Sequence, residues 1–169
     1  MDLMEGILTR RSVRKFVPGP VTADDVTAIL RAATSAPSAN DQRPWHFVVI
    51  DDRALLDQVP IYHPYSKMIL DVPVAILVVA EPALEKSKGY WVHDCAAATQ
   101  NLLLAVHARG LGGVWLGINP RPDREAGLRK ILGLPDDVIP FALVPIGHAA
   151  EQKGVVDRLD PARVHRNGW

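Results

Sequence analysis

Apolar residues recur every three to four positions in several stretches of the chain, a spacing typical of helices with one buried face. The clearest stretch begins at Thr22, a natural N-cap, carries two acidic residues in its first turn and ends before Pro37. Gly133 is expected to end a second helical stretch, which begins at Asp123. Helices are therefore predicted over residues 3–10, 22–35, 51–59, 65–70, 90–109 and 123–132.

The segment 90–109 is the longest of these helices, and it is apolar around almost its whole circumference. A helix of this kind is buried on nearly all sides. Its run of alanines, Ala96–Ala98, would let another helix approach closely. Two interpretations stay open: a central helix of the core, or a self-complementary helix at a dimer interface.

Four apolar runs have the length and the β-branched content of strands, and they cover residues 46–50, 72–80, 114–118 and 138–146. The run 72–80 is continuously apolar, as expected of a strand buried on both faces at the centre of a sheet. Pro140 and Pro145 interrupt the last run and favour an edge strand or an irregular ladder. The irregular alternation of helices and strands predicts an α+β or α/β sandwich around one sheet.

Composition adds limits on the class of protein. The 169 residues fit a single domain, residues 1–169, and 19 basic side chains balance 19 acidic ones. A neutral chain argues against a global grip on nucleic acid or an anionic membrane. The acidic N-terminus, the short apolar runs and the lone Cys95 predict a soluble, cytoplasmic protein without a disulfide. The polar segment 149–169 keeps apolar residues near its end and is expected to lie across a neighbour.

Several motifs of catalysis and binding do not occur in the sequence, among them a phosphate loop, a zinc-binding cysteine pair and a nucleophile elbow. His93 and Asp94 are adjacent, but consecutive helical residues point in different directions, so no joint metal or catalytic role is expected. Cys95 is interpreted as a core residue. Neither a catalytic side chain nor a metal site is predicted. Trp91, Trp115 and Trp169 are assigned to the core or to an interface.

A basic segment lies where the first predicted helix ends: residues 10–15, R-R-S-V-R-K, pack four cations and a hydroxyl into six positions. Arginine forks bind phosphate bidentately, and serine adds a donor. Because the rest of the chain is not basic, this segment suits one phosphate group better than a nucleic-acid track. The alternative is a solvated cationic helix end that interacts only with its own dipole.

A second motif, residues 36–47, places small and amide residues between a predicted helix and a predicted strand. Ser38, Asn40 and Gln42 supply donors and acceptors for the edge of a flat heterocycle. The alternative is an ordinary capping turn with Trp45 in the core.

Together, the two motifs resemble those of the nitroreductase family of FMN-dependent oxidoreductases, whose members carry R-R-S-x-R and then P-S-x-x-N-x-Q-P-W-x-F. Here the second motif reads P-S-A-N-D-Q-R-P-W-H-F, so that Asn40 comes one residue early and Arg43 is additional. The glycine-rich segment 110–117 and the closing Arg158-Leu159-Asp160 also fit the family's pattern. The resemblance implies a three-layer α-β-α sandwich, with helices flanking a mostly antiparallel sheet, in a homodimer.

The resemblance further implies that FMN lies at the dimer interface. The segment 10–14 would hold the phosphate and the pyrimidine edge, with Arg158 returning from the C-terminal segment to the phosphate. Residues 37–40 would come from the partner subunit. Backbone groups of 116–117 would face the flavin N5, and Lys67 would lie near N1 and O2. The implied cofactor-binding residues are Arg10, Arg11, Ser12, Arg14, Pro37, Ser38, Ala39, Asn40, Lys67, Leu116, Gly117 and Arg158, with Lys153 a looser candidate.

The implied activity is a two-electron, ping-pong transfer from NAD(P)H to a nitroaromatic, a quinone or a similar small acceptor, without nucleic-acid or membrane partners. No catalytic side chain is needed, because the flavin carries the electron chemistry. The alternatives are other flavin chemistry of dehalogenase, flavin-fragmenting or dehydrogenase type, and a non-catalytic flavin-binding regulatory dimer. A phosphate- or nucleic-acid-binding module that uses residues 10–15 is a further alternative.

Overall fold

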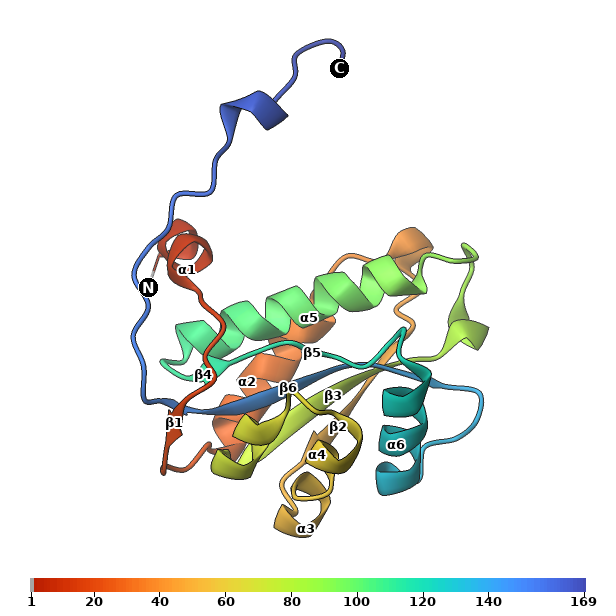
Figure 1. Cartoon of the computed structure of the whole chain (residues 1–169). Coiled ribbons are helices and arrows are strands. Elements are labelled where there is room, and N and C mark those ends of the chain that lie inside the picture. The colour runs from red at the N-terminus through yellow and green to blue at the C-terminus, as the bar shows by residue number, and fades with distance from the viewer. Residues whose placement is uncertain (1) are drawn as a thin grey trace.

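The computed structural model describes residues 2–169, in which helices cover both faces of one sheet (Figure 1). The helices are α1 (Leu3–Thr9), α2 (Ala23–Thr34), α3 (Arg53–Leu56), α4 (Val59–Tyr62), α5 (Trp91–Ala108) and α6 (Pro122–Leu132). The strands are β1 (Phe16–Val17), β2 (Trp45–Ile50), β3 (Val74–Ala80), β4 (Gly112–Gly113), β5 (Leu116–Gly117) and β6 (Ile139–Ala149). Four 3₁₀ turns join them: η1 (Ala39–Asp41), η2 (Lys67–Asp71), η3 (Pro82–Leu84) and η4 (Pro161–Arg163).

The sheet is antiparallel, with the order β1-β6-β3-β2 and with β4 and β5 also paired to β6. Every residue of β3 is buried, and successive side chains enter two different cores. Ile76 and Val78 pack on the side of α2 and α5, whereas Leu77 and Val79 pack on the side of α3, α4 and α6. The predicted central strand and the predicted α+β sandwich are therefore confirmed.

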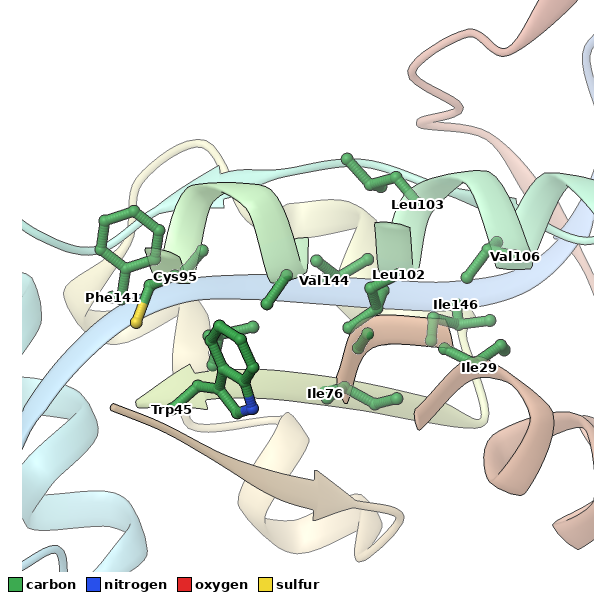
Figure 2. Close-up of a cluster of buried hydrophobic side chains, with 14 of the residues drawn as sticks. Ile29, Trp45, Ile76, Cys95, Leu102, Leu103, Val106, Phe141, Val144 and Ile146 are labelled. Atoms are coloured by element: carbon green, nitrogen blue, oxygen red, sulfur yellow. The ribbon is translucent and has the colours of Figure 1, made fainter. Parts of the chain in front are cut away.

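Helix α5 lies along one face of the sheet, and Figure 2 shows its Cys95, Leu102 and Val106 above β3 and β6. Cys95 is fully buried within this core, which confirms it as a core residue, and its burial raises the pKa of the thiol to about 12. The core interpretation of the helix is thus confirmed. Its outer face keeps Val92 exposed and Leu104 half-buried, so the interface interpretation stays a prediction. None of the described helices is long and apolar enough to cross a bilayer.

The prediction that β6 lies at an edge is wrong, because β6 pairs with β3 on one side and with β1, β4 and β5 on the other. The alternative of an irregular ladder is confirmed. Val78 pairs with Ala142 and Val79 with Pro140, which leaves Phe141 as an extra residue. Pro140 has no N–H group and cannot donate a ladder hydrogen bond, and a bulge interrupts the regular pairing at this point.

The predicted strand 114–118 is also corrected: within it only β5 is a strand, a second short strand, β4, lies just before it, and Val114 and Trp115 between the two are outside the ladder. Opposite this gap lies Pro145, which has no N–H to continue the pairing. The single helix predicted over 51–59 is two short helices, α3 and α4, and the one predicted over 65–70 is the 3₁₀ turn η2. The other predicted helices are confirmed.

The C-terminal tail, residues 150–169, leaves the sheet after β6 and runs past α1 away from the body (Figure 1). Its residues are exposed apart from Glu151. The apolar members Val155, Leu159 and Val164 are more than half exposed, and Trp169 is fully exposed and stacked on His165. Within the described chain, the tail therefore has apolar side chains that no core covers.

Candidate cofactor site

The basic segment, residues 10–15, is extended and joins α1 to β1. The capping box of α1, formed by Asp2 and Glu5, starts the helix, and Arg10 ends it. The backbone N–H of Val13 donates to the carbonyl of Gly113 at 3.0 Å, so that the segment lies against β4. A side chain at Gly112 would meet Val13 at 2.9 Å, which explains why this contact requires glycine.

Several cations gather here, and their guanidinium groups form no ion pair within the described chain. The pKa of Arg10 is lowered by burial first, and then by the like charges of Arg11 and Arg158. Arg11 donates through Nε to the carbonyl of Gly154 and through Nη1 to two carbonyls at the end of α1, while its buried Nη2 has no partner. Among the described residues, no carboxylate lies within 4.0 Å of the Arg10, Arg11, Arg14 or Arg158 guanidinium. Because like charges repel, this arrangement favours a bound anion.

Two cavities flank Arg10 and Arg11. One, of about 370 Å³, lies toward the C-terminal end of α5, and the other, of about 410 Å³, lies between α1 and the tail. Arg158 lines the second cavity and Lys153 the first. The Lys153 ammonium donates to the Ser12 carbonyl at 2.6 Å. The structure thus brings together five of the sequence-predicted residues: Arg10, Arg11, Ser12, Lys153 and Arg158.

The Pro37–Arg43 loop lies at the opposite end of α5. The N–H of Ala39 donates to the Asp94 carboxylate at 2.9 Å in the first turn of this helix, while Thr9 hydrogen-bonds His107 in the last turn. At 1.5 Å per residue, the positions 94 and 107 are about 20 Å apart along the helix axis. Within one chain, the structure therefore does not bring Pro37, Ser38, Ala39 and Asn40 to the basic segment.

Of the other predicted residues, Leu116, Gly117 and Lys67 lie on the side of the sheet that carries α6. Arg124 of α6 donates to the Gly117 carbonyl at 2.7 Å and lies 3.2 Å from Nε2 of His63. Burial and the Arg124 charge lower the pKa of His63. Gly117 has open space where a Cβ would stand, so its peptide is accessible to a flat ligand. Lys67 is exposed in η2.

Arg14 has the least defined position of the predicted residues. Its backbone N–H donates to the Glu151 carboxylate at 2.8 Å, and its side chain is exposed to solvent. Glu151 also pairs with Lys153 at 3.2 Å, and together these interactions lower its pKa. The carboxylate of Glu151 therefore ties the basic segment to the tail.

Comparison with known proteins decides the family. The sequence matches the Nitroreductase family over residues 7–71 and 60–148, which together span most of the chain. The chain belongs to this family. A relative from Methanothermobacter thermautotrophicus, named "Putative NADH dehydrogenase/NAD(P)H nitroreductase", is 47% identical over all of this chain and 88% of its own length. A 29% identical relative from Haliscomenobacter hydrossis, covering 92% of this chain and 83% of its own, is named an iodotyrosine deiodinase.

Solved structures agree with the nitroreductase-family fold. The crystal structure of a like-named nitroreductase from Bacteroides thetaiotaomicron superposes with a TM-score of 0.94, is 38% identical and covers 98% of this chain and 97% of its own. The crystal structure of a nitroreductase from Desulfovibrio desulfuricans in complex with FMN has a TM-score of 0.87, is 30% identical and covers 98% of this chain and 96% of its own. The predicted family and fold class are confirmed.

Sequence reasoning missed three polar residues that contact the candidate segments: His63, Asp94 and Arg124. It predicted that Gln42 would meet the edge of a heterocycle, whereas the Gln42 amide is buried and donates to Asp94. The sequence gives Asp94 no role beside its neighbour His93, which is exposed in the structure, whereas Asp94 is buried. A signal in the sequence is the carboxylate in the first turn of a helix that is apolar around almost its whole circumference. Such a carboxylate is buried, and a buried charge requires hydrogen-bond donors from another segment. Within the described part of the chain, no cluster of His, Cys, Asp and Glu could hold a metal ion.

Proposed function

We propose that this nitroreductase-family protein is an FMN-dependent oxidoreductase that uses NAD(P)H to reduce nitroaromatics, quinones or similar acceptors by a two-electron ping-pong mechanism. The observation that carries the proposal is the cation cluster of Arg10, Arg11 and Arg158, whose guanidinium groups have no carboxylate within 4.0 Å among the described residues. The names of the 47% identical relative and of the FMN-bound structure support it.

The residues present fit FMN in two ways. The buried Nη2 of Arg11 has no partner, and a phosphate oxygen is the acceptor that an arginine fork prefers. The open side of Gly117 lets a planar ring approach the backbone, which any larger side chain would obstruct. Arg10, Arg11, Ser12, Arg14 and Arg158 would thus hold the phosphate end, and Leu116 and Gly117 would face the ring.

A homodimer would complete each site. Closed two-fold symmetry places the same surface of each chain against the other. Such an arrangement can bring the loop residues Pro37, Ser38, Ala39 and Asn40 of one chain to the basic segment of the other, although they lie far apart within a chain. The exposed apolar residues Leu3, Met4, Ile7 and Leu8 of α1, together with the apolar part of the tail, support such an interface.

Each group of this chain has a defined task in the proposed reaction. Bound FMN would supply the hydride chemistry, accepting two electrons from NAD(P)H and delivering them to the acceptor. Arg10 and Arg158 would neutralise the phosphate, and the Pro37–Asn40 segment would exclude water from the second face of the ring. Lys67, exposed at the start of η2, would provide a positive charge near N1 and O2, where negative charge accumulates on reduction.

The first experiment is an absorbance spectrum of the purified protein, followed by anaerobic addition of NADH and of NADPH. We expect flavin bands near 370 and 450 nm that are bleached by the preferred nucleotide.

Replacing Arg10 by Ala should weaken FMN binding about tenfold or more, because a charge-assisted hydrogen bond is lost. Arg31→Ala, on the exposed side of α2, is the matched control and should bind FMN normally.

Four results would count against parts of the proposal. A colourless protein that takes up no added FMN would overturn it. Flavin that NAD(P)H does not bleach would favour the regulatory dimer. Intersecting rather than parallel lines in double-reciprocal plots would replace the ping-pong order with a ternary complex. Sedimentation velocity should report a dimer, and a monomer that binds FMN at full affinity would contradict the shared site.

The 29% identical deiodinase gives reductive dehalogenation as the second candidate. The test is iodide release from iodotyrosine by dithionite-reduced protein, compared with nitroaromatic reduction by the same preparation. Faster turnover of the iodinated substrate would move the assignment to this second candidate.

A further inference from the structure

The Pro37–Arg43 loop has an unusual backbone. Asn40, Asp41 and Arg43 adopt positive φ angles of 49°, 51° and 47°. L-residues other than glycine rarely take this conformation, and they keep it only when surrounding contacts enforce it. The loop contains no glycine to relieve the strain. Its conformation therefore requires a specific support.

That support comes from Asp94 at the N-terminal end of α5. This residue is only 4% exposed, and its two carboxylate oxygens accept from the Ala39 N–H at 2.9 Å and from Nε2 of Gln42 at 2.6 Å. No Lys, Arg or His of the described chain lies within 4.0 Å of it as an ion-pair partner. The two donors, together with the positive end of the helix dipole, are what stabilise its charge.

Gln42 extends the same connection to a third segment. It is 6% exposed, and its carbonyl oxygen accepts from the backbone N–H groups of Lys86 and Ser87, both at 2.9 Å. The Ser87 hydroxyl in turn accepts from the Asn40 amide at 2.7 Å. The orientation of the Gln42 amide is therefore fixed, because a flipped amide would set its NH₂ group against the N–H groups of Lys86 and Ser87 and its oxygen against the Asp94 carboxylate.

A simple turn does not need a buried charge, and burying one is costly unless donors meet it. Here the two donors, the Ala39 N–H and the Gln42 amide, belong to the same loop as Asn40, so that their bonds to Asp94 fix the position of this loop. We propose that Asp94 and Gln42 form a positioning pair that fixes the cofactor-facing conformation of the Pro37–Asn40 segment. The inference rests on the proposed FMN site, to which it assigns two residues that do not themselves touch the cofactor.

The test exchanges the chemistry of the two side chains. In D94N, one carboxylate oxygen becomes an NH₂ group that faces the NH₂ of Gln42. In Q42E, two carboxylates face each other. In the double variant D94N/Q42E, the new amide at position 94 can accept from the Ala39 N–H and donate to the new carboxylate at position 42. That carboxylate can still accept from the N–H groups of Lys86 and Ser87. Every hydrogen bond is then restored, with the charge moved from one side chain of the pair to the other.

We expect D94N to weaken FMN binding about tenfold and Q42E to weaken it more, since each loses a charge-assisted hydrogen bond. The double variant should recover to within about threefold of wild type, which is under 1 kcal/mol. Hydrogen exchange at the Ala39 amide, measured without FMN, should accelerate in D94N and recover in the double variant. Asp25→Asn, at a carboxylate that binds Thr22 and Arg109, is the control for a purely structural loss.

The outcomes separate this inference from the proposed function. If D94N melts at a lower temperature, as D25N is expected to, but binds FMN with wild-type affinity, the positioning role is overturned. A double variant no better than Q42E overturns it as well. A wild-type chain that binds no FMN overturns the proposed function itself, together with this inference.

Discussion

His63 is a buried histidine without a complete set of hydrogen-bond partners. It is 2% exposed, its Nδ1 has no hydrogen-bond partner, and its Nε2 lies 3.2 Å from the Arg124 guanidinium. Burial, and then the Arg124 charge, lower its pKa below the ordinary value of 6.5. The folded protein therefore favours the neutral ring.

Stability should consequently decrease on mild acidification. Well above pH 6.5 the His63 ring is neutral in both the folded and the unfolded chain. Below pH 6.5 the unfolded chain binds a proton at His63 and the folded chain does not, so stability falls as the pH decreases. The loss stops once the pH is below the lowered pKa of the folded state. Urea unfolding of wild type at pH 7.5 and 5.5 should show this loss, and His63→Gln should show a smaller one. His107, whose pKa burial and Arg10 also lower, makes His107→Gln a parallel case. An identical loss in H63Q and wild type would contradict the assignment.

At the scale of elements, the contact of α4 with α6 depends on a single glycine. A Cβ at Gly127 would lie about 2.2 Å from the Tyr62 ring. The two helices therefore pack closely enough to bury Gly127, and α6 carries Arg124 toward Gly117 as a result.

Replacing Gly127 by Ala should destabilise the protein by about 1–3 kcal/mol, because overpacking forces the helices apart. This outcome is opposite to the gain that alanine usually gives in a helix. Gly117→Ala adds the same methyl group in open space and should leave the melting temperature nearly unchanged. Thermal melts of both variants check the difference; equal melting temperatures would show that Tyr62 moves aside.

The elements that sequence could predict are those whose signal is local. The stripe and N-cap of α2, the apolar circumference of α5 and the uniform burial of β3 each appear within one window of the chain. The central place of β6 could not be predicted, because its neighbours are set by pairing with strands far away in sequence. The break between β4 and β5 had the same origin, since it lies opposite Pro145.

The candidate site divides in the same way. The basic segment and the Pro37–Arg43 loop have compact motifs, so their residues could be named from the sequence. Asp94 and Arg124 could not, because each acts on a segment distant along the chain: Asp94 on Ala39, and Arg124 on Gly117. The positive φ angle of Arg43 was equally hidden, since arginine, unlike Asn40 and Asp41, gives no signal for this conformation.

At the scale of the whole molecule, α5 joins both halves of the proposed site. Its first turn holds the Pro37–Arg43 loop through Asp94, and its last turn contacts α1 through His107 and Thr9. In the proposed dimer, each chain would therefore serve two different cofactors, one at each end of the same buried helix.

A genetic consequence follows from that placement. Arg10→Ala disables one half-site and Ala39→Trp the other, so that neither variant alone should retain an intact site. A mixed dimer would carry both defects in one site and none in the second. Co-expression of equal amounts should then restore about a quarter of the wild-type sites, measured as bound FMN. If instead each chain held its cofactor alone, the two inactive alleles would fail to complement each other.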